Sequence, residues 1–286
     1  MRARPSRSAG FTLVEAVVAI AASGAVLAGV AMFARVPIQG AVDQQRRAEL
    51  TDTADGALRR MGRDIRLALP NSLRVATAGG TTYLELLQTR TGGRYRASAD
   101  STGAGDFLNF AAVDNSFDML GGLPSVTGQA IQAGDRVVVY NLGITGSDTY
   151  AGTNSNVVFS TAAGTLANEG KINLGNGSLG TGVIRFPFAS PANRFHVVSG
   201  PVTYACNPVA GTLTRVSGYT IQASQPTGTY GGSPVTGVLA GRVSACSITY
   251  SSGVTERGGL VSIQLVLSAD GESVSLYHEV QVNNVP

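Results

Sequence analysis

The chain has 286 residues, enough for one or two domains with a hydrophobic core. Hydrophobic residues make up 43% of it, which argues against wholesale disorder, and charged residues only 14%. An ordinary soluble domain is roughly 25% charged. The two cysteines exclude a disulfide-dense scaffold and a four-cysteine zinc site, and the two histidines argue against a histidine-rich metal centre.

The net charge of +3 comes from the amino terminus. Arg2, Arg4 and Arg7 lie within the first ten residues, and the other 18 basic residues are matched by 18 acidic ones. If the leader is removed, the remaining chain carries no overall positive field that would attract nucleic acid. We therefore do not expect nucleic acid as a partner.

An apolar stretch over 11–34 follows this basic leader. Its length matches a membrane-spanning helix, and arginines in front of it predict a cytoplasmic leader and an exported remainder. A secretory signal peptide and a plain signal anchor are the ordinary interpretations. Neither accounts for Glu15, because a lone carboxylate in a membrane costs several kcal/mol unless it is paired or near the interface.

The sequence Gly10-Phe11-Thr12-Leu13-Val14-Glu15, between a basic leader and an apolar run, resembles the type IV prepilin signature. The resemblance implies that a membrane-bound prepilin peptidase cuts between Gly10 and Phe11 and methylates the new amino terminus at Phe11. In a stack of subunits, Glu15 of one chain would then pair with the Phe11 amine of its neighbour. Such a pair offsets much of the cost of two isolated charges in an apolar setting.

The helical pattern continues beyond the membrane segment. A stripe of apolar residues recurs at helical spacing, and it consists of Leu50, Ala54, Leu58, Met61, Ile65 and Leu69. Pro37 predicts a kink after the membrane segment, and Pro70 predicts the end of a helix over 11–69.

The polar side of this helix carries six arginines with interleaved acids. Asp55–Arg59 and Arg60–Asp64 are spaced as (i, i+4) ion pairs. This mixture indicates a solvated helix face or contacts between packed helices rather than a nucleic-acid surface.

The remainder of the chain has the composition of a β-rich domain, with short apolar runs between turn residues. The expected strands are 83–88, 136–141, 183–186, 202–206, 213–217 and 244–250. The clearest unit is a hairpin with alternating apolar residues over 261–267 and 274–282, joined at Asp270-Gly271. Glycine-, serine- and threonine-rich stretches over 90–130 and 143–181 predict long mobile loops.

The two cysteines, Cys206 and Cys246, both lie on expected strands. In an exported domain they suggest a disulfide, and two buried free thiols are the alternative.

The carboxyl-terminal segments CNPVAGTLTRVSGYTIQ, AGRVSACSITY and HEVQVNNVP resemble minor pilins of the mannose-sensitive haemagglutinin (MSHA) pilus system. They are similar, more distantly, to J-type minor pseudopilins of type II secretion.

No residue pattern predicts catalysis, a cofactor or a metal. The G-x-G-x-x-G match at 175–180 is interpreted as a glycine loop, because the following residues read as a strand rather than a helix. His278 is expected to be a hydrogen-bonded core residue, and no role is assigned to His196. Four loop residues could contribute to a calcium site, but their spacing is not that of an EF-hand and a solvated loop is favoured. They are Asp106, Asp114, Asn115 and Asp118.

These observations predict an α+β, pilin-like fold in which a long amino-terminal helix packs on an antiparallel β-sheet domain. The expected parts are a leader over 1–10, a transmembrane half-helix over 11–34, an amphipathic periplasmic half-helix over 35–70, and a β-rich periplasmic domain over 71–286. The protein would be a single-pass protein of the bacterial inner membrane that can enter a surface pilus.

The expected function is assembly rather than catalysis. The expected partners are the prepilin peptidase, other major and minor pilins, an inner-membrane assembly platform and, before assembly, membrane lipid. The alternatives are a J-type pseudopilin, or a membrane-tethered periplasmic enzyme or ligand-binding β domain.

Overall fold

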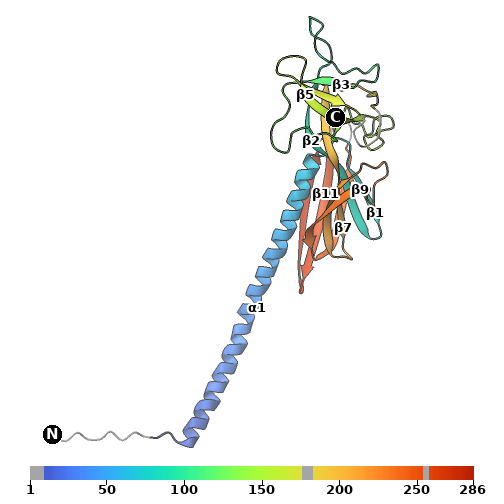
Figure 1. Ribbon diagram of the computed structural model, residues 1–286. Helices are drawn as coiled ribbons and strands as arrows, with labels where there is room; N and C mark the ends of the chain where they lie inside the picture. The colour runs from blue at the N-terminus through green and yellow to red at the C-terminus, as the bar shows by residue number, and fades with distance from the viewer. Residues whose placement is uncertain (1–9, 176–182, 254–257) are drawn as a thin grey trace, which may run out of the picture. The chain divides into compact units, whose positions relative to one another are not determined.

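The computed structural model of the chain describes residues 10–175, 183–253 and 258–286, without the side chains of 34–39. The chain divides into two compact units, Met1–Glu49 and Leu50–Pro286, which are described separately. A single helix, α1 (Leu13–Arg66), begins in the first unit and ends in the second (Figure 1).

Helix α1 begins at Leu13, two residues after the expected start, because Thr12 caps it. The Thr12 hydroxyl accepts a hydrogen bond from the backbone N–H of Glu15 at 3.3 Å, and it lies 3.5 Å from Glu15 Oε2. This is the Ser/Thr-x-x-Glu capping arrangement, which satisfies a backbone donor that the first turn leaves unpaired.

The first unit contains an apolar segment, Leu13–Phe33, of 21 residues with a mean hydropathy of 2.3. It is long and apolar enough to cross a membrane, and its large apolar side chains are exposed. The helix continues through Pro37, where a kink stays a prediction from the sequence.

The last turn of α1 closes at Arg66, three residues before the expected end at Leu69. Leu69 N–H donates to the carbonyl of Leu87 at 2.8 Å, and Thr89 N–H donates to the carbonyl of Leu67 at 2.9 Å. The chain has thus changed from helical to strand-type hydrogen bonding before Pro70 is reached.

The second unit contains two antiparallel sheets of nine and three strands among the residues described. The nine-stranded sheet has the order β1-β2-β3-β6-β5-β4-β7-β8-β9. Its strands are β1 (Arg74–Ala78), β2 (Thr81–Tyr95), β3 (Ser116–Leu120), β4 (Arg136–Val138), β5 (Ser155–Ala163), β6 (Gly170–Leu174), β7 (Arg194–Asn207), β8 (Thr212–Tyr219) and β9 (Gly232–Gly241). The smaller sheet consists of β10 (Val243–Ser251), β11 (Gly259–Ala269) and β12 (Glu272–Val282).

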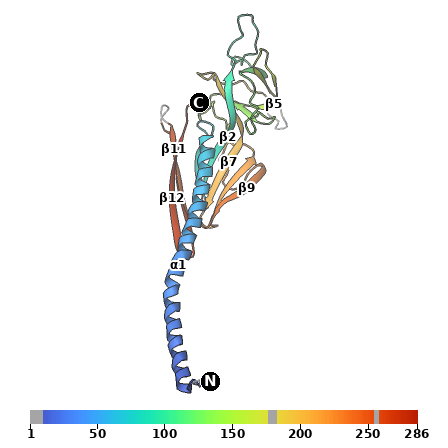
Figure 2. The same cartoon turned by 90° about the vertical axis from the view of Figure 1, so that its left-hand side faces the viewer.

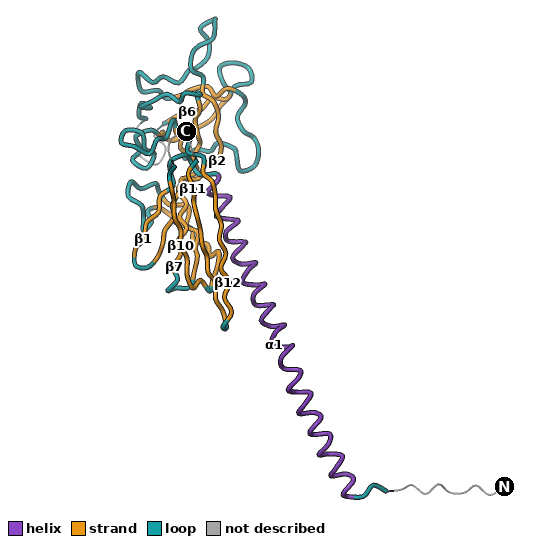
Figure 3. Tube along the Cα trace, turned by 180° about the vertical axis from the view of Figure 1, so that it is seen from behind, coloured by secondary structure: helices purple, strands orange, loops and turns teal. Residues whose placement is uncertain are grey.

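Six strands of the larger sheet close on themselves. Strand β2 pairs with β7 along most of its length and with β3 at its end, while β7 also pairs with β4. The remaining pairings, β3–β6, β6–β5 and β5–β4, complete an antiparallel ring. One hydrophobic cluster draws a side chain from each of the six strands, including Tyr95, Phe117, Val137, Val158, Ile172 and Phe195. We call this ring and its loops the barrel lobe (Figure 3).

The barrel lobe corrects two expectations. The stretches 90–130 and 143–181 were expected to be loops, but they contain the end of β2 and strands β3, β5 and β6. These strands lie among glycine-rich turns. The alternation of buried and exposed side chains along them becomes apparent only when the ring buries one face of each strand.

The expected strand over 183–186 is also wrong. The side chain of Asn156 binds the backbone N–H and carbonyl of Ile184 at 2.8 and 2.9 Å, in the place of a strand partner. Phe186 is buried in the core of the barrel lobe.

Below the barrel lobe, the last turns of α1 pack between the two sheets (Figure 2). The predicted apolar stripe is confirmed, since every member is at most 3% exposed: Leu50, Ala54, Leu58, Met61, Ile65 and Leu69. Full burial of a Leu, Ile or Met side chain stabilises a fold by roughly 1.5–3 kcal/mol. All members except Leu69 share one hydrophobic cluster with strands of both sheets.

The predicted hairpin is also confirmed as β11–β12. Asp270 and Gly271 form its two-residue turn with φ values of 49° and 86°, and Ala269 pairs with Glu272 across it. Positive φ at both central residues suits the right-handed twist of the two strands.

The two sheets are joined covalently. Cys206 on β7 and Cys246 on β10 form a disulfide across a sequence separation of 40 residues, which confirms the expected pairing. Both cysteines of the chain are therefore used, and neither is a free thiol.

Candidate functional site

The amino-terminal segment that carries the prepilin-like sequence is accessible. Gly10 and Phe11 precede the first helical residue, Phe11 is 82% exposed, and nothing lies within 4 Å of the position a Gly10 Cβ would take. A peptidase must bind the chain around the bond that it cuts, so a non-helical, open Gly10–Phe11 bond suits cleavage. Cleavage and methylation remain predictions from the sequence.

Glu15 lies in the first turn of α1, five residues after Gly10, and its side chain is exposed. A helix amino terminus carries a partial positive charge, so this position favours a carboxylate. Within the chain its hydrogen-bond partner is Thr12, which leaves the carboxylate open to a cation from another subunit. The role of Thr12 as the helix cap was missed, although the Thr-x-x-Glu spacing in the sequence indicates it.

Asp64 is the centre of a buried charge network between α1 and the larger sheet. It is 6% exposed and receives hydrogen bonds from Tyr204 Oη at 2.7 Å and Arg215 Nε at 2.8 Å. Arg60 Nε lies 3.5 Å away, as its (i, i+4) spacing predicts. Burial and the Asp64 carboxylate raise the pKa of Tyr204, so the phenol stays protonated and continues to donate. The expected Asp55–Arg59 pair also forms, at 2.7 Å.

A second buried network surrounds Glu85, which is fully buried. Its carboxylate lies 2.6 Å from Arg74 Nε and accepts a hydrogen bond from Tyr219 Oη at 2.9 Å. Burial raises the pKa of Glu85, and the Arg74 guanidinium opposes that shift. The Asp64 network joins α1 to the larger sheet, and the Glu85 network joins strands β1, β2 and β8 of that sheet.

The loop acids considered for calcium have structural partners instead. Asp118 is fully buried and accepts the backbone N–H groups of Asp106 and Thr165, at 2.9 and 3.1 Å. Asp106 forms an ion pair with Lys171 at 2.9 Å, and this pairing raises the pKa of the Lys171 amine. The expected solvated loop is therefore wrong for Asp118. Asp114 also accepts backbone N–H groups, and Asn115 is exposed.

No group of three or more His, Cys, Asp or Glu residues that could hold a metal occurs in the part of the chain that the structure describes.

The two histidines are half-buried. His278 lies on the inner side of β12, where a Cβ at Gly62 would come within 3.0 Å of its Nε2. Its ring makes no hydrogen bond to the described residues, so the expected hydrogen-bonded core histidine is wrong in that respect. Burial, together with the charge of Arg194, lowers the pKa of His196 on β7.

The glycine loop at 175–180 lies outside the described residues except for Gly175.

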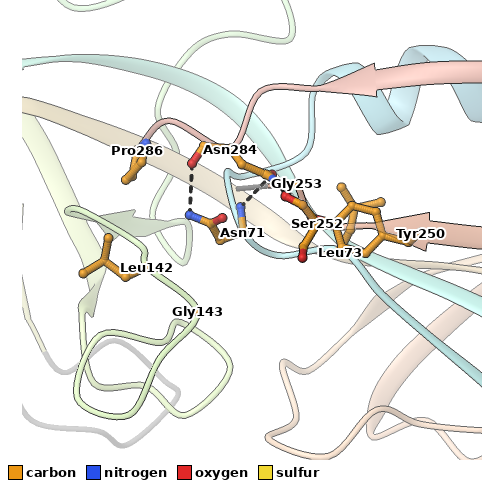
Figure 4. Close-up of a pocket in the computed structure, with 9 residues that line it drawn as sticks. All are labelled: Asn71, Leu73, Leu142, Gly143, Tyr250, Ser252, Gly253, Asn284 and Pro286. Atoms are coloured by element: carbon orange, nitrogen blue, oxygen red, sulfur yellow. Dashed lines mark hydrogen bonds between the residues drawn. The ribbon is translucent and has the colours of Figure 1, made fainter. Parts of the chain in front are cut away.

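A cavity of about 360 Å³ lies where the carboxyl-terminal segment meets the connection after α1 (Figure 4). Asn71 and Asn284 point toward each other, with Asn71 Nδ2 donating to the Asn284 carbonyl at 3.2 Å and Asn71 N–H donating to Asn284 Oδ1 at 3.3 Å. Burial raises the pKa of Tyr250, so its phenol stays protonated near neutral pH. The side chains that line the cavity offer the amides of Asn71 and Asn284, the Tyr250 phenol and the Ser252 hydroxyl.

Residues 5–31 match a protein-family model described as the prokaryotic N-terminal methylation motif. The match covers the Gly10–Glu15 sequence and most of the apolar segment. No curated protein and no solved structure matches the chain. The motif supports a type IV pilin-like or pseudopilin-like protein, and such a protein is processed by a prepilin peptidase and associates with other pilins.

Proposed function

We propose that this protein is a minor pilin-like subunit that acts by assembling into a filament rather than by catalysis. The observation that carries the proposal is the N-terminal methylation motif over residues 5–31, which coincides with an open Gly10–Phe11 bond and an exposed Glu15. The described networks of buried charge hold the fold together, which is consistent with a structural subunit.

In this proposal the prepilin peptidase cuts after Gly10 and methylates Phe11. Glu15 then pairs with the Phe11 amine of a neighbouring pilin, and the apolar segment Leu13–Phe33 moves from lipid into the filament. The pairing offsets the cost of transferring two charges into an apolar core and so favours one register between subunits. An inner-membrane assembly platform would drive the transfer.

The proposed arrangement has a leader over 1–10, a membrane segment over 11–34, an amphipathic half-helix over 35–70 and a periplasmic domain over 71–286. We assign the subunit to an MSHA-like pilus on the strength of the carboxyl-terminal segments that resemble minor pilins of that system. A J-type pseudopilin role is the second candidate, supported by the weaker likeness of the same segments.

The decisive experiment is mass spectrometry of the mature amino terminus, from cells with and without the prepilin peptidase. The expected chain begins at N-methyl-Phe11 and stays uncut when the peptidase is absent. A chain beginning beyond Ala28, or still at Met1 in the wild type, would falsify the proposal.

A Glu15→Ala variant separates assembly from simple tethering. We expect it to be processed and exported but to enter filaments poorly, because the Phe11 amine loses its counter-charge. Normal assembly of this variant would favour a membrane-tethered enzyme or ligand-binding β domain.

A further inference from the structure

Arg136 differs from the other half-buried arginines of the second unit. Among its described residues, four such arginines each form an ion pair: Arg74 with Glu85, Arg90 with Asp135, Arg96 with Glu169, and Arg215 with Asp64. Arg136 has no carboxylate partner, and its hydrogen bond is to the Ser155 hydroxyl at 3.3 Å. The adjacent Asp135 lies 2.8 Å from Arg90 Nε instead.

This isolation has an energetic consequence. A cation that is partly removed from water loses hydration, and that loss is recovered only when a counter-charge or several hydrogen bonds replace it. Burial lowers the pKa of Arg136, with no carboxylate acting in the opposite direction. A guanidinium has five N–H donors, so most of those of Arg136 are left for another acceptor.

Strand β4 places Arg136 on the outer side of the barrel lobe. Val137 and Val139 belong to the core of the lobe, whereas Val138 belongs to a separate small cluster with Val198 and Leu87. Because side chains alternate along a strand, Arg136 lies on the same side as Val138. It is thus held beside an apolar cluster rather than free in solvent.

A crevice of about 400 Å³ lies at this position. Its walls come from three segments, which are Gly134 with Arg136, Val198–Pro201, and Gly218–Ile221. A β-bulge opposite Gln88 and Thr89 leaves Ser199 outside the regular pairing of β7 with β2. The Cβ positions of Gly134 and Gly200 face open space, with nothing within 4 Å.

The lining combines one cation, hydroxyl groups and a limited apolar surface. Ser199 and Thr220 supply hydroxyls, the glycines expose backbone groups, and the half-buried Ile221 supplies apolar contact. A volume of about 400 Å³ exceeds what a simple inorganic anion fills and lies in the range of small-molecule sites. Arginine binds a carboxylate through two parallel N–H···O bonds, which fixes its orientation.

We propose that the Arg136 crevice binds a small hydroxylated carboxylate, of the sugar-acid class, with its carboxylate on the Arg136 guanidinium. The hydroxyls of the ligand then contact Ser199, Thr220 and the exposed backbone, and the C–H face of its ring lies on Ile221. All residues of this site lie in the second unit, and none belongs to the amino-terminal segment.

The test uses the full chain in detergent and isothermal titration calorimetry with D-glucuronate, with D-glucose as the uncharged probe. We expect the wild type to bind glucuronate in the millimolar range or more tightly, and glucose far more weakly. Arg136→Met should weaken glucuronate binding by at least about tenfold, since it removes a charge-assisted contact. The matched control is Arg63→Gln, which removes an exposed arginine on α1 and should bind as the wild type does.

Thermal unfolding without ligand shows whether Arg136 has a structural role instead. We expect Arg136→Met to unfold at the same temperature as the wild type or higher, because the cation it removes has no counter-charge. Arg136→Lys keeps the positive charge but lacks the planar guanidinium that forms two parallel hydrogen bonds. This variant should fold normally but bind glucuronate more weakly than the wild type. Absence of glucuronate binding by the wild type, equal binding by Arg136→Met, or a markedly lower melting temperature of that variant would each overturn the proposal.

Discussion

Asp64 provides the buried negative charge at the contact between helix α1 and the larger sheet. Its carboxylate accepts hydrogen bonds from the buried Tyr204 and the half-buried Arg215. Asp55, about two and a half helical turns earlier, forms a surface ion pair with Arg59. Removing one partner of a buried pair leaves the other charge without compensation, so the two positions should respond very differently.

We expect Asp64→Ala to lower the free energy of unfolding by about 3–5 kcal/mol, because the Arg215 guanidinium would be left without its counter-charge. Urea unfolding of the detergent-solubilised chain, followed by near-ultraviolet circular dichroism, measures the change. Asp55→Ala is the control, and an exposed helix pair contributes only about 0.5 kcal/mol. Equal losses in the two variants would contradict the assignment.

Residue-scale features divide into those visible in the sequence and those that are not. The (i, i+4) ion pairs and the Thr-x-x-Glu cap depend on neighbours within one helical turn, so spacing indicates them. Asp118 on β3 binds the backbone of Thr165, which is 47 residues away in the connection between β5 and β6. No local pattern contains that information.

At the scale of elements, the disulfide between β7 and β10 joins two sheets that share one hydrophobic cluster with α1. Cross-linking restricts the unfolded chain, and the effect grows slowly with the length of the closed loop.

We expect the double variant Cys206→Ser/Cys246→Ser to lose about 3–4 kcal/mol of unfolding free energy, from loop-closure entropy for this separation. A reducing agent should lower the stability of the wild type by a similar amount and leave the double variant unchanged. Equilibrium urea unfolding with and without reductant measures both effects. A wild type that is indifferent to reductant would show that the bond does not contribute to stability.

The hairpin β11–β12 and the barrel lobe illustrate how differently elements are encoded. In the hairpin, strict alternation flanks an Asp-Gly turn, so both strands and their register can be predicted from about twenty consecutive residues. In the barrel lobe, β4 has three residues and β3 and β6 have five each. Such short strands carry too few alternations to be distinguished from loop.

At the scale of the whole molecule, the second unit buries many of its tyrosines. Burial raises the pKa values of Tyr95, Tyr150, Tyr204, Tyr219, Tyr230 and Tyr250, and that of Tyr230 reaches about 12. In the unfolded chain these phenols ionise near pH 10. At a pH between the pKa of a phenol in the unfolded chain and its pKa in the folded protein, the folded state keeps a proton that the unfolded state has released.

The stability of the protein should therefore be complete below pH 10 and fall as the pH rises from about 10 towards 12. Urea unfolding at a series of alkaline pH values measures the decline, and absorbance near 295 nm reports phenolate formation. Tyr230→Phe should make the decline shallower, because it removes one of the groups that titrates in this window. A stability independent of pH above 10, or tyrosines that ionise fully near pH 10 in the folded protein, would contradict the burial.

Features with local causes can be predicted from the sequence alone. They are the prepilin-like segment and its apolar run, the apolar stripe of α1, the β11–β12 hairpin and the pair of cysteines suited to a disulfide. Each depends on residue types at short spacing, which helix and strand geometry converts directly into a face or a turn.

Which segments close the barrel lobe depends on contacts between distant parts of the chain. So does the environment of Arg136, which alone among the described half-buried arginines of the second unit has no carboxylate partner. Residues of β2 pair with residues of β7 that lie at least 100 positions later in the sequence, from Thr82 with Cys206 to Arg94 with Arg194. These pairings are favoured because the complete ring buries apolar side chains from all six strands. No short stretch of sequence contains the information on that combined burial.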